Sequence, residues 1–379
     1  MANNLSEVIP KLLAQGLLAL RENAVMPRLV NSDYSTMAAE KGDVINVPIP
    51  SAVEVTNVTA ANTAPDPGDS NPTSAQIPLD NWKEAAFYLT DKNLKESMDG
   101  IIPMQASEAI KSLSNTIDSG LLGLYLDIYG FAGTPGTTPF ASSTTEATQA
   151  RKVLSQQLSP LDSRRVVIDP DAEANALDLR AFQDMSFSGS AAGILEGQIN
   201  RKLGFDWFMD QNVTGHENGA QDGAYVVNGV NAVGAAVLVV KTGANDVHQG
   251  DTFTIAGDTQ TYVCTELYAG GAGSVAISPP LKVATAGDEV ITFKGTASMT
   301  YTQNLAFHRD CFAFASRPLL DTGIGLGNII QSAVDPVSGL TLRLEVSREH
   351  KRTRFSYDIL YGLATVRPQL GCRIWGAAV

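Results

Sequence analysis

The segment from Pro103 to Ile128 constrains the fold of this chain more than any other stretch. Its apolar residues recur every three or four positions and so form one stripe along a helix. Pro103 suits a first helical turn, and Gly130 suits a stop. At 1.5 Å per residue the helix is about 39 Å long, so we expect a strut across a domain. The stripe consists of Ala106, Ala109, Ile110, Leu113, Ile117, Leu121, Leu124 and Ile128.

Charge and size narrow the class of protein. Glu108, Lys111 and Asp118 lie inside the helix, so it is not a membrane span. The chain has 379 residues, enough for two or three domains, and a net charge of −13. Neutralising phosphates requires clustered Lys and Arg, so the chain as a whole does not have the composition of a nucleic-acid binder.

The three cysteines predict reduced thiols in the core. Cys264, Cys311 and Cys372 are odd in number and widely spaced, which fits neither a disulfide framework nor a zinc site. The first apolar run follows Glu7 and Lys11 and lacks the basic region of a signal peptide. We therefore expect intracellular synthesis.

The N-terminal region predicts an arm followed by a ribbon. Residues 5–21 have the pattern of an amphipathic helix, and the arm after it could pack on another subunit or on its own domain. Residues 43–50 alternate as a strand, but Pro48 and Pro50 restrict it to an edge or a two-stranded ribbon. Strand character resumes at 75–79 and again at 83–89, after a polar tract. This pattern indicates a long hairpin with a solvated tip, which needs a partner surface.

The middle of the chain predicts an α/β region. We expect a helix over 145–158, a buried strand over 164–168, a helix over 170–182 and a strand pair within 186–213, with Trp207 in the core. Asp169, Asp171 and Glu173 fail the calcium-loop pattern, and acids at a helix start stabilise the helix dipole instead.

Residues 214–297 change character. Helical periodicity disappears, and short alternating runs follow one another at intervals of roughly ten residues, separated by Gly, Asp and Asn. This spacing predicts a small antiparallel barrel or sandwich. Because strand character resumes at 300–315, the unit is expected to be inserted into a host domain.

The closing strands hold the chain's one positive cluster. Strands are expected over 340–346 and 357–366, with a last strand that ends at Trp375. A basic tip lies between the first two strands. Its residues could form ion pairs between subunits, or they could contact nucleic acid or an acidic partner such as a scaffold. Its candidate contact residues are Arg348, Lys351, Arg352 and Arg354.

Motifs of catalysis and of cofactor or metal binding are absent from the sequence. There is no HExxH, GxSxG, Walker loop or CxxC pair, and the Gly323-x-Gly325-x-Gly327 run lacks dinucleotide-site spacing, so we expect a flexible loop there. A hydrolase would need His216 or His308 beside a nucleophile. The sequence predicts no catalytic, cofactor or metal site.

The order of these parts resembles the major capsid proteins of tailed phages. The resemblance is closest to the coat family of the short-tailed Salmonella phage P22, with an HK97-type fold and an inserted β-domain. Five stretches across nearly the full length carry it, and their ordered combination matters more than any one of them. They are Glu22–Val25 with Val30, Asn31 and Tyr34; Gly42–Val44; Gly197–Asn212; Asn304–Arg309 with Ala315–Leu319; and Tyr361–Gly362 with Arg367–Pro368.

The resemblance implies an α+β fold with assigned domains. The assignment is an N-terminal arm over 1–42, an extended loop over 43–90, a peripheral domain over 91–144 with spine helix 103–128, an axial domain over 145–213, an inserted β-domain over 214–297 and closing strands over 298–379.

The resemblance also implies a structural function in the virion. Such subunits form the pentamers and hexamers of an icosahedral shell around double-stranded DNA, are assembled in the bacterial cytoplasm with scaffolding and portal proteins, and expand on maturation. No enzyme activity, cofactor or membrane is implied. Lys83 is the only lysine in the ribbon strands, and we expect no isopeptide crosslink. The alternatives are another phage structural protein, a carbohydrate-binding adhesion protein, or a hydrolase.

Overall fold

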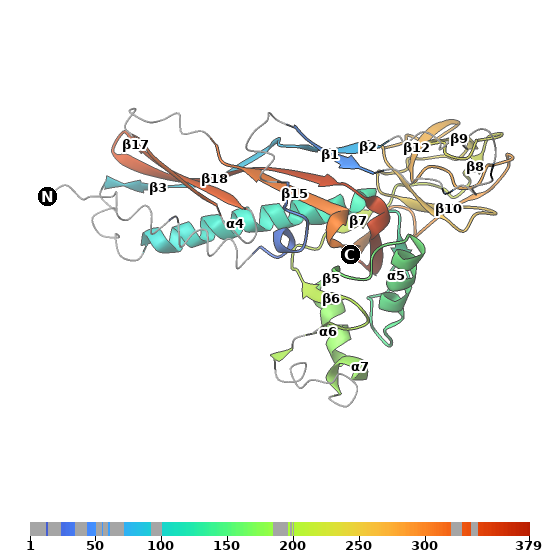
Figure 1. The fold of residues 1–379 in the computed structure, drawn as a ribbon, viewed down its shortest axis with the longest axis horizontal. Helices are drawn as coiled ribbons and strands as arrows, with labels where there is room; N and C mark the ends of the chain where they lie inside the picture. The colour runs from blue at the N-terminus through green and yellow to red at the C-terminus, as the bar shows by residue number, and fades with distance from the viewer. Residues whose placement is uncertain are drawn as a thin grey trace.

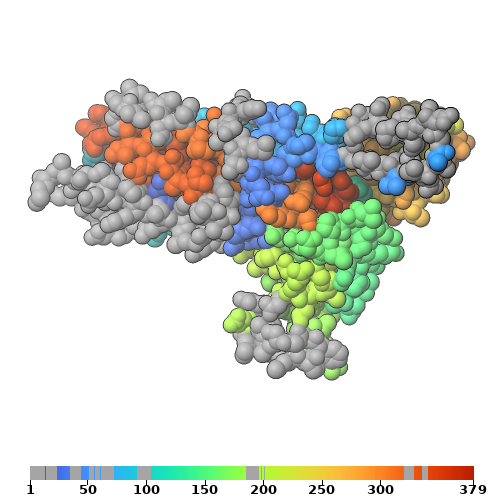
Figure 2. Space-filling model, in the orientation of Figure 1, coloured from blue at the N-terminus to red at the C-terminus, as the bar shows by residue number. Residues whose placement is uncertain are grey.

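The computed structural model describes residues 13, 24–34, 44–50, 55, 60, 72–91, 101–184, 196–197, 199, 201–319, 328–334 and 340–379. These residues form an elongated body in which one long helix runs beside a main sheet (Figure 1). A small barrel lies at one end of the body, and a mixed α/β lobe projects from its side (Figure 2).

The helices of the described residues are mostly short, apart from one. None of them combines the length and the apolarity that crossing a membrane requires. Their bounds are η1 Met26–Arg28, α4 Ile101–Gly123, η2 Leu124–Asp127, α5 Thr145–Gln156, α6 Pro170–Asp178, α7 Arg180–Gln183, η3 Arg309–Cys311 and η4 Pro368–Leu370.

The strands of the described residues form four sheets. A ribbon pairs β1 Val44–Ile49 with β2 Thr73–Pro78. The main sheet contains β3 Asn81–Thr90, β15 Phe312–Arg317, β16 Ile329–Val334, β17 Thr341–Glu349 and β18 Arg352–Thr365. The lobe sheet contains β4 Phe131–Ala132, β5 Arg164–Ile168, β6 Asp206–Met209, β7 Gly215–Glu217, β14 Thr300–His308 and β19 Gly371–Ala378. The barrel contains β8 Val226–Val227, β9 Val237–Thr242, β10 Thr252–Ile255, β11 Thr261–Cys264, β12 Gly273–Ser278 and β13 Ile291–Phe293.

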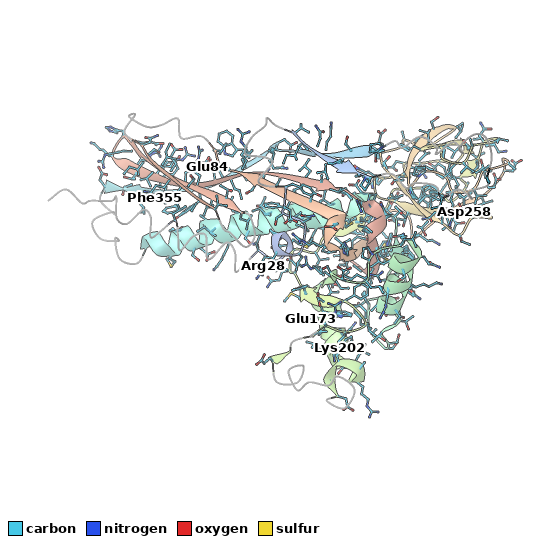
Figure 3. All side chains as sticks on the ribbon, in the orientation of Figure 1. Arg28, Glu84, Glu173, Lys202, Asp258 and Phe355 are labelled. Carbon is cyan, nitrogen blue, oxygen red and sulfur yellow. The ribbon has the colours of Figure 1, made fainter. Side chains whose placement is uncertain are left out.

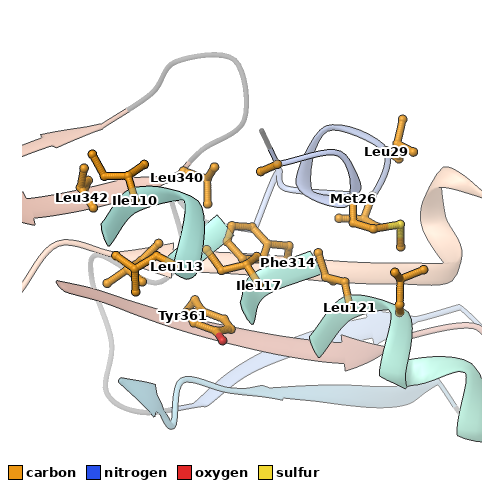
Figure 4. Packing of buried hydrophobic residues seen from close by; sticks show 14 of the residues in the cluster. Met26, Leu29, Ile110, Leu113, Ile117, Leu121, Phe314, Leu340, Leu342 and Tyr361 are labelled. Carbon is orange, nitrogen blue, oxygen red and sulfur yellow. The ribbon is translucent and has the colours of Figure 1, made fainter. Parts of the chain in front are cut away.

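The predicted stripe of α4 faces the core. Ile110, Leu113, Ile117 and Leu121 are buried against the main sheet, as the close view shows (Figure 4). The α-helix ends at Gly123 and continues as the 3-10 helix η2 to Asp127, so the predicted helix to residue 128 is confirmed to Asp127 but is not α-helical after Gly123. Glycine lowers helix propensity there, and the tighter turn η2 still carries the chain's apolar residues into the core.

The predicted hairpin divides between two sheets. β1 pairs with β2, but β3 pairs along its whole length with β18 and belongs to the main sheet. The prediction that residues 83–89 continue the ribbon is therefore wrong. Ala85, Phe87 and Leu89 alternate with exposed residues and contact the main core, which holds β3 in this sheet.

The ribbon finds its partner surface in its own chain. Ile45, Val47 and Ile77 are buried and share a cluster with Ala313 and Ala315 of β15. Burial of this one face supplies the stability that an isolated ribbon lacks. Most of the polar tract between the two strands, residues 51–71, lies outside the described residues.

The described part of the N-terminal arm also packs on its own chain. Ala24 and Met26 are buried against the core, and Asn31 forms a bridge with Ala313 of β15. The amide of Asn31 donates to the Phe312 carbonyl, and the Phe314 amide donates to the Asn31 carbonyl. Residues 24–34 therefore pack on their own domain, which is one of the two alternatives for the arm. Most of the predicted helix at 5–21 lies outside the described residues.

The lobe is built largely as predicted. β5 occupies the expected range and α5 ends two residues before its expected end, and Trp207 is a core residue that packs edge-on against Phe140 and Phe182. The expected helix over 170–182 is two helices, because Leu179 between them is extended. Within 186–213 the structure describes one strand, β6, while 185–195, 198 and 200 lie outside the described residues.

The barrel has a hydrophobic cluster of its own. Its strands run in the order β13-β10-β11-β12-β9-β8, and a bridge from Val226 to Val290 closes the sheet on itself. The two strands that flank it, β7 and β14, pair with each other. The chain thus leaves the lobe sheet and returns to it at neighbouring strands. All three cysteines are free and buried, as predicted.

Candidate functional site

The four predicted contact residues lie together at the tip of the β17–β18 hairpin. Arg348 is on β17, Arg352 and Arg354 are on β18, and Lys351 is in the turn with a positive φ of 55°. Together with β3 this tip forms the end of the described body farthest from the barrel (Figure 1), and Phe355 of β18 and Asp258 of the barrel lie toward opposite ends of the body in Figure 3. We call the outward face of β3 and the β17–β18 tip the hairpin surface.

Three of these four residues are neutralised by acids of the same chain. Arg348 Nη2 lies 2.7 Å from Asp91 Oδ2, and Arg352 Nε donates to Glu349 at 2.6 Å. Arg354 pairs with Glu84 of β3. Lys351 is exposed, and its carbonyl accepts from the Asp91 amide at 3.1 Å. The tip is therefore an internal charge network that joins the hairpin to β3.

Two aromatic residues of β3 complete the hairpin surface, and sequence reasoning missed both. The Arg352 guanidinium lies 4.3 Å from the centre of the Tyr88 ring, and Arg354 lies 5.9 Å from it. Trp82 is 62% exposed. Alternation within β3 already placed both aromatics on one face; it could not show that this face lies beside the arginines of β18.

A buried ion pair anchors the inner part of the hairpin surface. Arg343 of β17 donates through Nε and Nη2 to both oxygens of Asp358 on β18, at 2.9 and 2.5 Å. The Trp82 indole donates to the same carboxylate at 2.9 Å. Bidentate geometry and burial make this the strongest charged contact between the two strands.

A second polar network joins the barrel to the rest of the protein. His216 of β7 lies between Asp251, 2.9 Å from its Nε2, and the Tyr125 hydroxyl of η2, 3.2 Å from its Nδ1. Burial lowers the pKa of His216, and the Asp251 hydrogen bond offsets this only in part. A neutral ring that donates from Nε2 and accepts at Nδ1 satisfies both partners. The other Asp251 oxygen accepts from the Gly219 and His248 amides.

Arg373 of β19 closes this network, which we call the junction. It is fully buried, and its Nη2 donates to the Gly250 carbonyl at 2.8 Å. Its guanidinium lies 5.8 Å from the ring centres of both Tyr125 and Trp375. Burial lowers the pKa of Arg373 to about 10, so it remains charged at neutral pH. Sequence reasoning noted His216 only as a possible catalytic base and did not find Arg373.

The junction has the connectivity of a catalytic triad but not its access. Tyr125, His216 and Asp251 are at most 7% exposed, so a substrate cannot reach them. His308, the other candidate base, is 6% exposed and accepts from the Asp310 amide. Within the described ranges no three His, Cys, Asp or Glu residues gather to hold a metal ion. The Gly323–Gly327 run lies outside the described residues.

The structure tests the predicted helix start near Pro170 and the predicted role of the acids there. Asp171 and Glu173 lie in its first turn, where acids favour the helix dipole. Asp169 precedes the helix, but its side chain makes no capping hydrogen bond. The predicted helix start is confirmed, and the stabilisation comes from the first-turn acids.

Comparison with solved structures defines a fold class. A chain of Mycobacterium phage Che8 matches with a TM-score of 0.53 and 15% identity, covering 93% of this chain and 90% of that one. This likeness shows a shared fold.

Two further solved structures are similar at lower scores. A capsid chain of cyanophage P-SCSP1u covers 93% of this chain and 88% of its own, with 11% identity and a TM-score of 0.49. A mature-capsid chain of bacteriophage PhiM1 covers 89% and 82%, with 10% identity and a TM-score of 0.45. No family model and no curated protein matches the sequence.

Proposed function

We propose that this chain is the major capsid protein of a tailed double-stranded DNA phage, with an HK97-type fold closest to the P22 coat family. The observation that carries the proposal is the fold likeness to the Mycobacterium phage Che8 chain, which extends over 93% of the present chain. The sequence resemblance supports it independently, because it came from ordered motifs rather than from overall shape.

The proposed subunit assembles into pentamers and hexamers of an icosahedral shell. The shape supports this assembly, because an elongated body offers long lateral edges to its neighbours (Figure 2). In this proposal residues 1–42 are the arm, 43–90 include the extended loop, 145–213 belong to the axial domain and 214–297 are the inserted domain. Scaffolding and portal proteins, packaged DNA and expansion on maturation belong to the same proposal, as does residence in the virion after assembly in the host cytoplasm.

The hairpin surface is proposed to contact a neighbouring subunit rather than DNA. Arg348, Arg352 and Arg354 are already paired with acids, so little net positive charge remains to attract phosphates. Exposed Trp and Tyr beside arginines are instead the composition that protein interfaces favour. Lys351, which forms no ion pair among the described residues, stays within this proposed contact.

Electron microscopy of the purified full chain, alone and with the scaffolding protein of its phage, tests the proposal. We expect closed shells, or tubes and spirals with a regular lattice. A monodisperse monomer or small oligomer under every condition would contradict a capsid role and favour an adhesion protein or another phage structural protein. The variant Trp82→Ala tests the proposed contact between the hairpin surface and a neighbouring subunit. It should weaken the lattice without unfolding the subunit.

A further inference from the structure

The main sheet ends in two different strands. β18 pairs with β15 and β17 on one side and with β3 on the other, and β16 lies outside β17. Among the described residues, β3 pairs only with β18, and β16 pairs only with β17. Each of the two therefore has one edge that faces no other strand of the described chain. Such an edge is a template for a strand from another molecule.

The β3 edge lacks most of the features that prevent such pairing. β3 contains neither proline nor glycine, and its register with β18 is continuous from Asn81 to Thr90, without a bulge. Its charged residues are Lys83 and Glu84, and Glu84 is paired with Arg354. β16, with the sequence IIQSAV, contains no charge, proline or glycine. Both edges are therefore suited to further pairing.

The space beside β3 is open to an incoming strand. A polar groove of about 830 Å³ lies between the start of β3 and α4. Asn81 and Lys83 of β3 line one side of it, and Lys111 and Asn115 of α4 line another. Because α4 covers the core face of the sheet, a strand added to β3 would lie over this groove.

We propose that β3 of one copy of this chain pairs with β16 of a second copy, so that the main sheets of neighbours join into one. β16, β17, β18 and β3 are antiparallel in succession, so β3 runs opposite to β16. A second copy in the same orientation therefore brings its β16 to β3 as an antiparallel partner, without being turned over. The choice of a second copy rests on the proposed function, in which copies of the chain are neighbours.

The side chains on the two edges fit this pairing. Trp82 and Tyr88 are exposed on the outward face of β3. Because Ala333 packs on the main core, alternation places Ile330 and Val334 on the outward face of β16. Pairing sets the two aromatic residues on the same face as the two β-branched ones, a favourable combination across antiparallel strands.

The contact is head-to-tail, because the two edges belong to different strands. Two copies joined in this way keep one free β3 edge and one free β16 edge, so addition continues until a ring closes. Pairing of β3 with β3 would instead be two-fold symmetric and would bury both β3 edges in one dimer. The proposed pairing therefore provides the closed rings that pentamers and hexamers require.

Disulfide trapping in the full chain tests the pairing. Ala86 and Ser332 are exposed near the middle of the two strands, and each is replaced by cysteine in a separate chain. Oxidation of a mixture of Ala86→Cys and Ser332→Cys should yield at least about tenfold more covalent dimer than oxidation of either variant alone, because the two thiols are held within bonding distance. Denaturing gels without reductant measure the dimer. The native cysteines are buried and do not compete.

Three controls make the result specific. In a chain with both substitutions, β17 and β18 separate the cysteines by three strand spacings, about 14 Å, so they cannot bond within one copy and should form a ladder of multimers. Ile330→Cys and Val334→Cys cover a register shifted by two residues, since these positions share one face with Ser332. Thr292→Cys, exposed on the barrel strand β13, should give only background with Ala86→Cys.

Two results would overturn the pairing. One is a yield of mixed dimer that stays at the Thr292→Cys background for all three positions of β16. The other is a yield from Ale86-free mixtures no lower than from the mixture with Ala86→Cys, or from Ala86→Cys alone as high as from the mixture. Mixed dimers in preparations that never close into shells would support the pairing and contradict the capsid role. Shells without mixed dimers would contradict only the pairing.

Discussion

The hairpin surface and the junction use the same kinds of side chains in opposite surroundings. In both, an arginine lies beside an aromatic ring, within a network that contains a carboxylate. At the hairpin surface, Arg348 and Asp91 keep side-chain exposures of 63% and 41%. At the junction, the side chains of His216 and Asp251 are 4% and 2% exposed. Water can replace a lost partner at the first site and cannot at the second.

This difference separates a surface that can change partners from a joint that fixes geometry. Exposed ion pairs contribute about 0–1 kcal/mol each, so a neighbouring molecule can compete for the same arginines. A buried network whose members are removed one at a time leaves uncompensated polar groups. The junction therefore holds the barrel in one orientation, and the following variants would break or sharpen this contrast.

Asp251→Ala should have the largest effect. It leaves His216 and the amides of Gly219 and His248 without their acceptor, and should lower the free energy of unfolding by about 3–5 kcal/mol. Chemical denaturation measures the loss. Asp246→Ala is the matched control, because Asp246 lies in the same loop but its side chain is 41% exposed, and it should cost under about 1 kcal/mol. Equal losses in the two variants would contradict the claim that the buried junction depends on its carboxylate more than an exposed site does.

Asp358→Ala should have an intermediate effect. The carboxylate receives two bonds from Arg343 and one from Trp82, and its loss leaves Arg343 nearly buried without its bidentate acceptor. We expect a loss of about 1.5–3 kcal/mol in the free energy of unfolding. Glu345→Ala, on the same strand as Arg343, provides the control. If Asp358→Ala lowers the free energy of unfolding no more than Glu345→Ala does, the Arg343–Asp358 pair contributes as little as an exposed ion pair.

The two histidines of the junction region should respond to pH with opposite signs. Burial lowers the pKa of His216, so its protonation favours the unfolded state, and the stability it supports is lost as pH falls below about 6.5. For His248, burial opposes the charge, but hydrogen bonds to Glu217 and Asp246 raise the pKa; its contribution is present below about 6.5 and lost as pH rises.

Thermal melts of His216→Gln and His248→Gln from pH 5 to pH 8 check this. The stability gap between the wild type and His216→Gln should narrow on acidification, whereas the gap to His248→Gln should widen. If the stability gap between the wild type and each variant stays constant with pH, the pKa of neither histidine is shifted by folding in the expected direction.

Arg348→Ala should have the smallest effect on the isolated subunit. Removing its exposed bond to Asp91 should change the free energy of unfolding by at most about 1 kcal/mol. Under the proposed intersubunit role, however, the same variant should change assembly yield and its dependence on salt. A large loss of subunit stability would instead make this residue structural.

Local periodicity predicted the elements well and the partners poorly. The strands Thr252–Ile255 and Thr261–Cys264 and the stripe of α4 follow from alternation and helical spacing, which neighbouring residues alone determine. The pairing of β3 with β18 does not, because both strands have the same alternating pattern and many pairings would bury it. The acids Glu84 and Asp91 were therefore visible in the sequence but could not be assigned to Arg354 and Arg348.

Buried polar groups were the least predictable part of the site. Asp118 served in the sequence only as a charge that excludes a membrane span. Its partners are backbone amides, which every residue except proline carries, so no side-chain signature could reveal them. Arg373 is similar, since a lone arginine within a strand reads as exposed until its burial is known.

The pairing of β7 with β14 has an evolutionary consequence. The two ends of the barrel segment lie side by side, so a short turn could replace the whole segment and leave the lobe sheet unchanged. Loss of the barrel would also remove the Gly250 carbonyl from Arg373 and the Asp251 carboxylate from His216. A lineage that sheds the barrel would leave both side chains without these partners, so the constraint that the barrel places on positions 216 and 373 would disappear with it.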